Sequence, residues 1–233
     1  MAESNTAFSV FVTGTDTGVG KSLVSAALLL TLAKHYPRVV GMKPVAAGTS
    51  EIKGIQANDD VLALRAASTV SVPPELDNPV LLADAVSPHI AAARAGVEIS
   101  IPHITSCHRQ LLQLADVVVV EGAGGFMVPL SDTETGADLA QALNLPLVLV
   151  VGMRLGCLNH TLLTLEAIRA RGLKLVGWVA NHIDPAMQAQ ASNITFLQRH
   201  IPAPLLASIA WQDDADPKNV KLDLPTSWLL PLA

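Results

Sequence analysis

The stretch from Phe8 to Leu30, FSVFVTGTDTGVGKSLVSAALLL, constrains the fold of this chain more than any other. β-Branched and aromatic residues over 8–13 predict a strand, and the apolar residues that follow Lys21 have the spacing of a helix. Between them lies a glycine-rich turn, whose backbone N–H groups can approach phosphate oxygens because no side chains block them. A strand, a glycine-rich loop and a helix with Gly-Lys-Ser at the junction form the layout of a phosphate-binding P-loop.

The spacing within this loop departs by one residue from Gly-x-x-x-x-Gly-Lys-Ser. Thr15 stands where that pattern has glycine, and Gly14 precedes it. We expect Lys21 to bring positive charge to the outer phosphates and the Ser22 hydroxyl to ligate Mg²⁺. The helix start adds unpaired N–H donors at the positive end of its dipole. A glycine-rich turn beside a surface lysine is the simpler alternative, but the agreement of strand, loop and helix favours the P-loop.

Composition and charge exclude several other classes. The 233 residues are half hydrophobic, which predicts one α/β domain over 1–233 with a sizeable core. A net charge of −5 without a Lys/Arg cluster speaks against a nucleic-acid partner. No apolar run reaches the roughly 18 residues of a membrane span, and residues 1–7 lack a secretory signal pattern. Cys107 and Cys157 stand outside metal-ligand spacing, so we expect a reduced, cytoplasmic protein with both thiols buried.

Strand patterns alternate with helix patterns along the whole chain. We expect further strands over 38–42, 116–120, 145–151, 173–180 and 204–209. We expect helices after the P-loop, over 58–67 and over 100–114, and a helix that opens at 87–89 with Ser87 as its cap. Further helices are expected after residue 135 to about 143, after the 152–160 stretch to about 171, and over 185–200. Residues 49–57 are expected to be a mobile loop, the proline-rich residues 71–88 have no clear assignment, and the tail from Trp211 shows no clear element. This alternation predicts an α/β, P-loop NTPase-like fold with a mostly parallel sheet and helices on both faces.

Charged and polar residues follow several of these strands. Lys43 ends the second strand, Glu121 with Gly122-Ala123-Gly124 ends the strand over 116–120, and Asn181 ends the strand over 173–180. The carboxyl ends of parallel strands share one edge of the sheet, where ligands bind. Each residue also has a simpler interpretation, as a solvated lysine or a charged residue before a flexible loop. The turn at Gly156 fits an anion-binding turn and an ordinary strand-to-helix loop equally well.

In this order and spacing, several short segments closely resemble dethiobiotin synthetases along nearly the whole chain. They are GTDTGVGKS, KPVAAG, NDDVLAL, SPHI, VEGAGG, VVGMRLGCLNH, WVAN and IPAPLL. The resemblance implies a ligase of biotin biosynthesis that couples 7,8-diaminononanoate, CO2 or bicarbonate, and ATP, with Mg²⁺. It also implies a homodimer, in which the 154–159 loop of the neighbouring subunit binds the substrate carboxylate.

The resemblance also assigns roles to individual residues. Lys43, Lys21 and Thr17 would act on the reacting groups, and Ser22, Asp60 and Glu121 would surround Mg²⁺. ATP would be bound by Gly18, Val19, Gly20, Lys21, Ser22, Leu23, Asp60, Glu121, Gly122, Ala123, Gly124, Asn181, His182, Ala210, Trp211 and Gln212. The substrate would be bound by Lys43, Ala47, Leu155, Gly156, Cys157 and Asn159.

The chain departs from the family pattern at four of its site positions. Ala47 stands where many members have a hydroxyl residue, which removes one expected hydrogen bond to the substrate. Gly18 replaces a glutamate found in some members. His182 replaces an aspartate, and Ala210 replaces a proline, so the recognition of the base is less defined than the recognition of phosphate.

Two neighbouring families and a degenerate nucleotide-binding module are the alternatives. A cobyrinate-type amide synthase shares the P-loop, but it usually carries a glutaminase domain for which these 233 residues leave no room. A partition or septum-type ATPase switch has an extra lysine near the start of the P-loop, where this chain has Thr15, Asp16 and Thr17. A module without turnover would not need Lys21, Lys43, Asp60 and Glu121 together.

Overall fold

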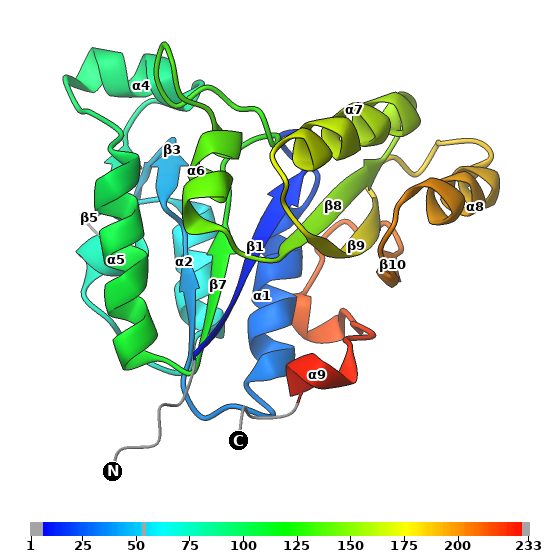
Figure 1. Ribbon diagram of the computed structural model, residues 1–233, viewed down its shortest axis with the longest axis horizontal. Helices are drawn as coiled ribbons and strands as arrows, with labels where there is room; N and C mark the ends of the chain where they lie inside the picture. Colours follow the sequence, from blue (N-terminus) through cyan, green and yellow to red (C-terminus); the bar gives the residue numbers. More distant parts are fainter. Residues whose placement is uncertain (1–6, 53–54, 230–233) are drawn as a thin grey trace.

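The structure is a computed structural model that describes residues 7–52 and 55–229. Its centre is a six-stranded sheet in the order β10-β9-β8-β1-β7-β2, in which all neighbouring strands are parallel. The strands are β1 (Phe8–Gly14), β2 (Val39–Met42), β7 (Val117–Glu121), β8 (Leu147–Met153), β9 (Leu175–His182) and β10 (Leu205–Ile209). The predicted α/β fold with a mostly parallel sheet is therefore confirmed (Figure 1).

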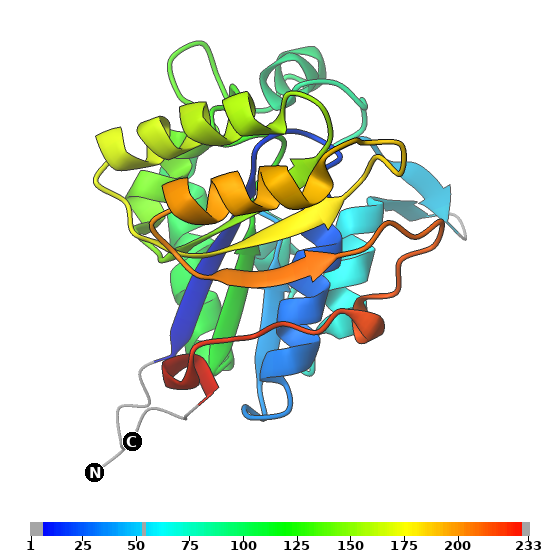
Figure 2. The same ribbon diagram turned by 90° about the vertical axis from the view of Figure 1, so that its right-hand side faces the viewer.

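Helices cover both faces of this sheet (Figure 2). One face is covered by α1 (Lys21–Leu32), α2 (Asp59–Ala67) and the tail with α9 (Thr226–Leu229). The other face is covered by α5 (Ile101–Leu114), α6 (Gly136–Leu143), α7 (Cys157–Ala170) and α8 (Gln190–His200). The two short helices α3 (Pro74–Asp77) and α4 (Pro88–Ala95) lie next to this second layer.

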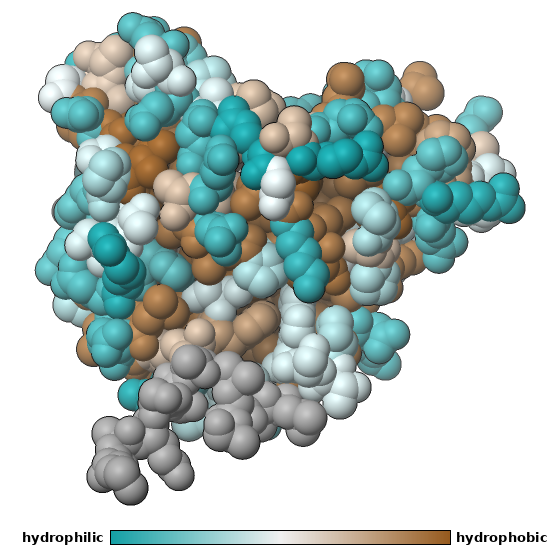
Figure 3. Space-filling model, viewed as in Figure 1, coloured by the Kyte–Doolittle hydropathy of each residue, from teal (hydrophilic) through white to brown (hydrophobic). Residues whose placement is uncertain are grey.

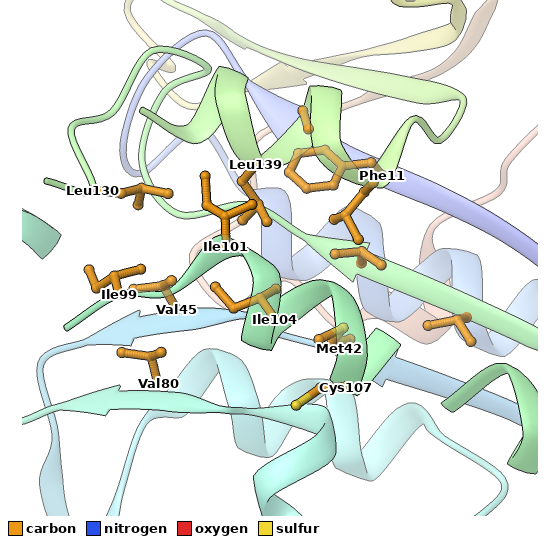
Figure 4. Packing of buried hydrophobic residues seen from close by; sticks show 14 of the residues in the cluster. Phe11, Met42, Val45, Val80, Ile99, Ile101, Ile104, Cys107, Leu130 and Leu139 are labelled. Carbon is orange, nitrogen blue, oxygen red and sulfur yellow. The ribbon is translucent and has the colours of Figure 1, made fainter. Parts of the chain in front are cut away.

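The central strands read as continuous apolar runs because they are buried on both faces. In β7, Val118 and Val120 pack with Phe11 and Ile104 on the α5 side, whereas Val117 and Val119 pack toward α1. Figure 4 shows the α5 side of this core, where Phe11, Ile101, Ile104 and Leu139 come together from three elements. The apolar runs therefore determine the position of β1, which lies between β7 and β8 and carries the P-loop at its end.

Four short strands of the described residues lie outside the main sheet. β3 (Val45–Ala47) pairs in parallel with β6 (Val80–Leu82), and β4 (Ser50–Ile52) pairs antiparallel with β5 (Ile55–Ala57). The prediction of a mobile loop over 49–57 is therefore wrong for its described residues, although residues 53–54 lie outside them. Strands of three residues are too short to show a recognisable alternation in the sequence.

Two other expectations also need correction. The helix expected from Pro185 begins only at Gln190, because the backbone between them forms turns and Ala189 has a left-handed φ of 55°. The tail, expected to be irregular, forms a 3₁₀ helix, η1 (Pro217–Asn219), and α9 (Thr226–Leu229). Trp228 of α9 is buried, and its ring centroid lies 5.2 Å from that of Phe8.

Candidate functional site

The P-loop connects β1 to α1 and is braced by a distant asparagine. Gly20 occupies the N-cap of α1 in the left-handed region at φ 89°, and a Cβ there would lie 2.2 Å from Asn181 Nδ2. Only glycine fits this position. The same Nδ2 donates a hydrogen bond to the Val19 carbonyl oxygen at 2.9 Å. Asn181, near the end of β9, therefore lies against the loop, as expected from the shared sheet edge.

Four of the predicted site residues converge beside this loop. The Lys43 ammonium donates to Glu121 Oε1 at 2.5 Å and to Asp60 Oδ2 at 2.8 Å. The Ser22 hydroxyl lies 2.5 Å from Asp60 Oδ1 and 2.8 Å from Glu121 Oε1. These residues come from the end of β2, the first turn of α1, the first turn of α2 and the end of β7.

The charged side chains of this cluster are buried, so the charges of the lysines and carboxylates interact strongly with one another. Lys43 and Glu121 are buried, with side chains that are 4% and 0% exposed. Burial disfavours the charged form of Lys43, but the carboxylates of Glu121 and Asp60 raise its pKa above the ordinary value. Burial and the nearby Lys43 charge lower the pKa of Lys21 to about 8. The lysines and carboxylates thus form one coupled charge network.

The donor set fits a hard divalent cation such as Mg²⁺. Asp60, Glu121 and Ser22 present carboxylate and hydroxyl oxygens within one cluster, which is the ligand chemistry that Mg²⁺ prefers. Glu121 Oε2 is buried and has no hydrogen-bond partner among the described residues, so it has an unused pair of electrons there. In the described ranges no group of three or more His, Cys, Asp or Glu side chains could hold a metal, and this set has two carboxylates.

Two residues that sequence reasoning did not assign extend the network. The Asp16 carbonyl oxygen accepts a hydrogen bond from Lys21 Nζ at 3.0 Å, and its Oδ1 accepts from the Thr17 N–H at 2.8 Å. Its other carboxylate oxygen forms a salt bridge with Arg154, in the turn between β8 and α7. Asp16 therefore connects the P-loop to the 154–159 loop. The signal in the sequence is a carboxylate inside an otherwise small and neutral phosphate loop.

The residues expected around the base lie on the β9 and β10 side. His182 Nε2 is 3.1 Å from the Ser208 hydroxyl of β10, and His182 Nδ1 is buried without a partner among the described residues. Ala210, Trp211 and Gln212 follow β10 and are exposed. Ala210 and Gln212 line a hollow of about 190 Å³ between β10 and η1. They are on the expected side of the P-loop, away from Lys43.

The residues expected to bind substrate are not gathered in one place. Ala47 lies in β3 and is half-buried, whereas Leu155 and Asn159 are exposed at the start of α7. Cys157 is buried in the core under α7, so only its backbone is available to a ligand. Gly156 is the N-cap of α7 with φ 95°.

The loop after β7 lies against the P-loop. A Cβ on Gly124 would be 3.5 Å from the Thr17 hydroxyl, and the Gly122 carbonyl oxygen lies 3.4 Å from Lys43 Nζ. Gly122 and Ala123 line a small cavity with Glu121. The expected nucleotide residues Gly18, Val19 and Leu23 belong to the P-loop and the first turn of α1.

A family model described as AAA domain, AAA_26, matches residues 9–219, which include the P-loop, Lys43, Asp60, Glu121 and Asn181. The chain belongs to the AAA_26 family. This membership, together with the P-loop and its lysine, identifies an ATPase-like domain. The AAA_26 family includes dethiobiotin synthetases, although membership alone does not distinguish them from other AAA_26 proteins.

Several solved structures share the fold of this AAA_26 chain. A ParA family ATPase from Chlorobium tepidum has 16% identity and a TM-score of 0.54, with 88% of this chain and 85% of that chain covered. The MinC:MinD cell division complex of Aquifex aeolicus has 14% identity and a TM-score of 0.53, with 89% and 83% covered. The GDP complex of the signal recognition particle receptor FtsY from Elizabethkingia anophelis has 13% identity and a TM-score of 0.50, with 96% and 62% covered. This chain therefore spans less than two thirds of that receptor chain.

Over the described residues, each helix is too short or too polar to cross a bilayer.

Proposed function

We propose that this protein closes the cyclic urea of dethiobiotin from 7,8-diaminononanoate, CO2 and ATP. The observation that carries the proposal is the buried contact of Lys43 with Glu121 and Asp60, next to Ser22. A P-loop that only binds and releases nucleotide needs Lys21 and a metal-binding carboxylate. A second buried lysine at the metal site suits a reaction in which another anion meets the γ-phosphate.

The proposed reaction has three steps, and each one makes a separate demand on the site. One substrate amine attacks CO2, forms a C–N bond and loses a proton, which gives a carbamate. A carbamate oxygen attacks the γ-phosphorus, the bond to the β–γ bridging oxygen breaks, and ADP leaves. The second amine then attacks the carbamate carbon, loses a proton and expels phosphate. The product contains the cyclic urea.

In this proposal, residues of the chain bind the phosphates and neutralise the charge that develops during phosphoryl transfer. Lys21 and the P-loop amides bind the phosphates, and Lys43 neutralises the charge that develops between the carbamate and the γ-phosphate. Ser22, Asp60 and Glu121 would hold Mg²⁺, which would supply charge neutralisation for the phosphate oxygens. Thr17, next to the Gly124 turn, lies within the loop that faces the reacting groups.

The substrate has a hollow available beside the P-loop. This open hollow of about 360 Å³ lies between the loop and α7, and its lining includes Thr15, Asp16, Met127 and Leu163. A lining that combines polar and apolar side chains suits an aliphatic chain that carries two amines. The neighbouring subunit would complete this site with its 154–159 loop.

A homodimer fits the surface chemistry of this face. Leu155 is 94% exposed, Leu163 is 62% exposed and Met127 is 48% exposed. The space-filling view shows apolar residues between the polar ones on the face that carries α7 (Figure 3). We propose that α7 and its preceding turn form the interface that brings the partner's loop to the substrate.

The experiment that tests the function is ADP release by the full chain, with bicarbonate and diaminononanoate omitted in turn. Dependence of ADP release on both compounds, with formation of the cyclic urea detected by mass spectrometry, supports the ligase. A partition or septum-type switch would hydrolyse ATP at the same rate without either compound. A cobyrinate-type relative would require an acid substrate and an ammonia source instead.

A further inference from the structure

The phosphate loop of this protein contains a carboxylate, whose negative charge opposes the binding of an anion. Between Gly14 and Ser22 the charged residues are Asp16 and Lys21. The Lys21 ammonium, which is assigned to the outer phosphates, lies 3.0 Å from the backbone carbonyl oxygen of Asp16. An unneutralised charge on the Asp16 side chain would therefore act directly on a polyphosphate bound at Lys21.

Contacts on several sides fix the orientation of Asp16. Its Oδ1 accepts a hydrogen bond from the Thr17 N–H at 2.8 Å, and its Oδ2 accepts one from Arg154 Nη2. The backbone of Asp16 packs against the loop after β7, where a Cβ on Gly125 would lie 3.5 Å from the Asp16 Cα. Both carboxylate oxygens therefore accept hydrogen bonds from the protein, and Arg154 brings one positive charge to them.

Arg154 reaches the phosphate loop from the turn between β8 and α7. Its backbone carbonyl oxygen accepts a hydrogen bond from the Cys157 N–H at 3.0 Å, within the turn that opens α7. The side chains of Arg154 and Asp16 are 43% and 39% exposed, and an ion pair this exposed contributes little to the stability of a fold. Because the pair lies next to Lys21, we expect it to affect phosphate binding more than folding.

We propose that Arg154 is a positioning residue of the nucleotide site, which neutralises Asp16 and holds its carboxylate on the side of the α7 turn. The proposal rests on the proposed function for the location of the outer phosphates at Lys21. Phosphates that enter the loop then meet the Lys21 ammonium and the backbone N–H groups, without an uncompensated carboxylate beside them. When the guanidinium is removed, Asp16 keeps its hydrogen bond from the Thr17 N–H, but its charge repels the phosphates.

Calorimetric binding of the non-hydrolysable ATP analogue AMPPNP, with Mg²⁺, to the full chain tests this proposal. We expect Arg154→Gln to weaken AMPPNP by at least about fivefold, because the charge of Asp16 is no longer neutralised. Adding Asp16→Asn to Arg154→Gln should restore the affinity to within about threefold of the parent protein, since asparagine accepts from the Thr17 N–H without a charge. Arg154→Lys keeps the positive charge and should also stay within about threefold. A merely structural contact would not be repaired by removal of its second partner.

A matched control removes the same charge from another exposed ion pair of this region. Arg169 of α7 forms a salt bridge with Glu166 at 2.6 Å, and Arg169→Gln should leave the AMPPNP affinity unchanged.

Three results would overturn the proposal: parent-like AMPPNP affinity of Arg154→Gln, no restoration by Asp16→Asn, or unfolding of Arg154→Gln in a thermal melt. The last result would make the pair a structural contact. In about 0.5 M salt, the loss in Arg154→Gln should shrink, because the charges are half-exposed and are screened. None of these results affects the assay of diaminononanoate-dependent ADP release by the parent protein. Conversely, restored AMPPNP affinity in the double variant, without such ADP release by the parent protein, would refute the proposed reaction alone.

Discussion

The Lys43 ammonium lies 2.5 Å from Glu121 Oε1, and both side chains are buried at the end of neighbouring strands β2 and β7. Removing one partner of such a pair costs about 3–5 kcal/mol, because the other charge stays buried without compensation. We expect Lys43→Met to lower the free energy of unfolding by this order, measured by chemical denaturation. Mg²⁺ should restore more stability to this variant than to the parent protein, since it can bind the unpaired carboxylates.

The same substitution separates catalysis from nucleotide binding. We expect Lys43→Met to lower kcat roughly 100-fold or more, with a change in ATP affinity below about threefold, since Lys43 is assigned to charge that develops during transfer. Stopped-flow kinetics and calorimetry measure the two effects. Lys174, which is exposed at the start of the β9 region, provides a control as Lys174→Met. Equal losses in kcat and in affinity would contradict the role of Lys43.

Lys21→Ala should abolish ATP binding and turnover together. The Lys21 ammonium is buried against the Asp16 carbonyl oxygen at the first residue of α1, where the outer phosphates are expected. Lys34→Ala, at an exposed position just after α1, should retain both activities. Full ATPase activity of Lys21→Ala would remove the assignment of the phosphate site.

Ala47→Ser should tighten binding of diaminononanoate by about 0.5–1.5 kcal/mol, if the added hydroxyl forms the hydrogen bond found in many family members. Ala47 is half-buried at the end of β3, so a hydroxyl can be added without filling the core. Equilibrium binding of the substrate measures the change, and Ala47→Val adds bulk without the hydroxyl. Equal affinities for the serine variant and the parent protein would mean that this position does not contact the substrate.

His108 should make the stability of the protein depend on pH. It is buried next to the Ser9 hydroxyl, with Oγ to Nε2 at 3.0 Å, and burial lowers its pKa to about 4. Between about pH 6.5 and pH 4 the unfolded chain binds this proton and the native protein does not. Stability therefore falls as the pH falls through this window, by up to about 3 kcal/mol.

Urea denaturation at a series of pH values measures the contribution of His108. We expect His108→Gln, which keeps a polar partner for Ser9 but does not titrate, to flatten the profile over this window. His103→Gln replaces an exposed histidine of the same helix and should leave the slope unchanged. If the free energy of unfolding of His108→Gln still falls between pH 6.5 and pH 4 as in the parent protein, another group is responsible for the pH dependence.

The main sheet was predictable from the sequence because its strands β1, β2, β7, β8 and β9 are apolar runs bounded by turn residues. The pattern over 116–120, for example, corresponds to β7 with a shift of one residue. The parts that the sequence did not reveal depend on contacts instead of periodicity. The hairpin of β4 and β5 has three residues on each side, and α9 is ordered where Trp228 meets Phe8, more than 200 residues away along the chain.

The convergence of Lys43, Glu121 and Ser22 followed from topology, since the carboxyl ends of β2, β7 and β1 meet at one edge. Asp60, in the first turn of α2, was assigned only through the family resemblance. The salt bridge between Asp16 and Arg154 could not be predicted in the same way. It joins two loops whose side-chain directions no strand pattern determines. The roles assigned to individual residues at the site stay predictions until they are measured.

The central position of β1 separates the residues assigned to phosphoryl transfer from the residues assigned to the base. On one flank, the ends of β2 and β7 contribute Lys43 and Glu121, whereas on the other flank β9 and the segment after β10 contribute the residues assigned to the base. Mutations in one flank can therefore be selected with little interference from the other. In such an architecture, substitutions can change the base specificity while the residues of phosphoryl transfer stay the same.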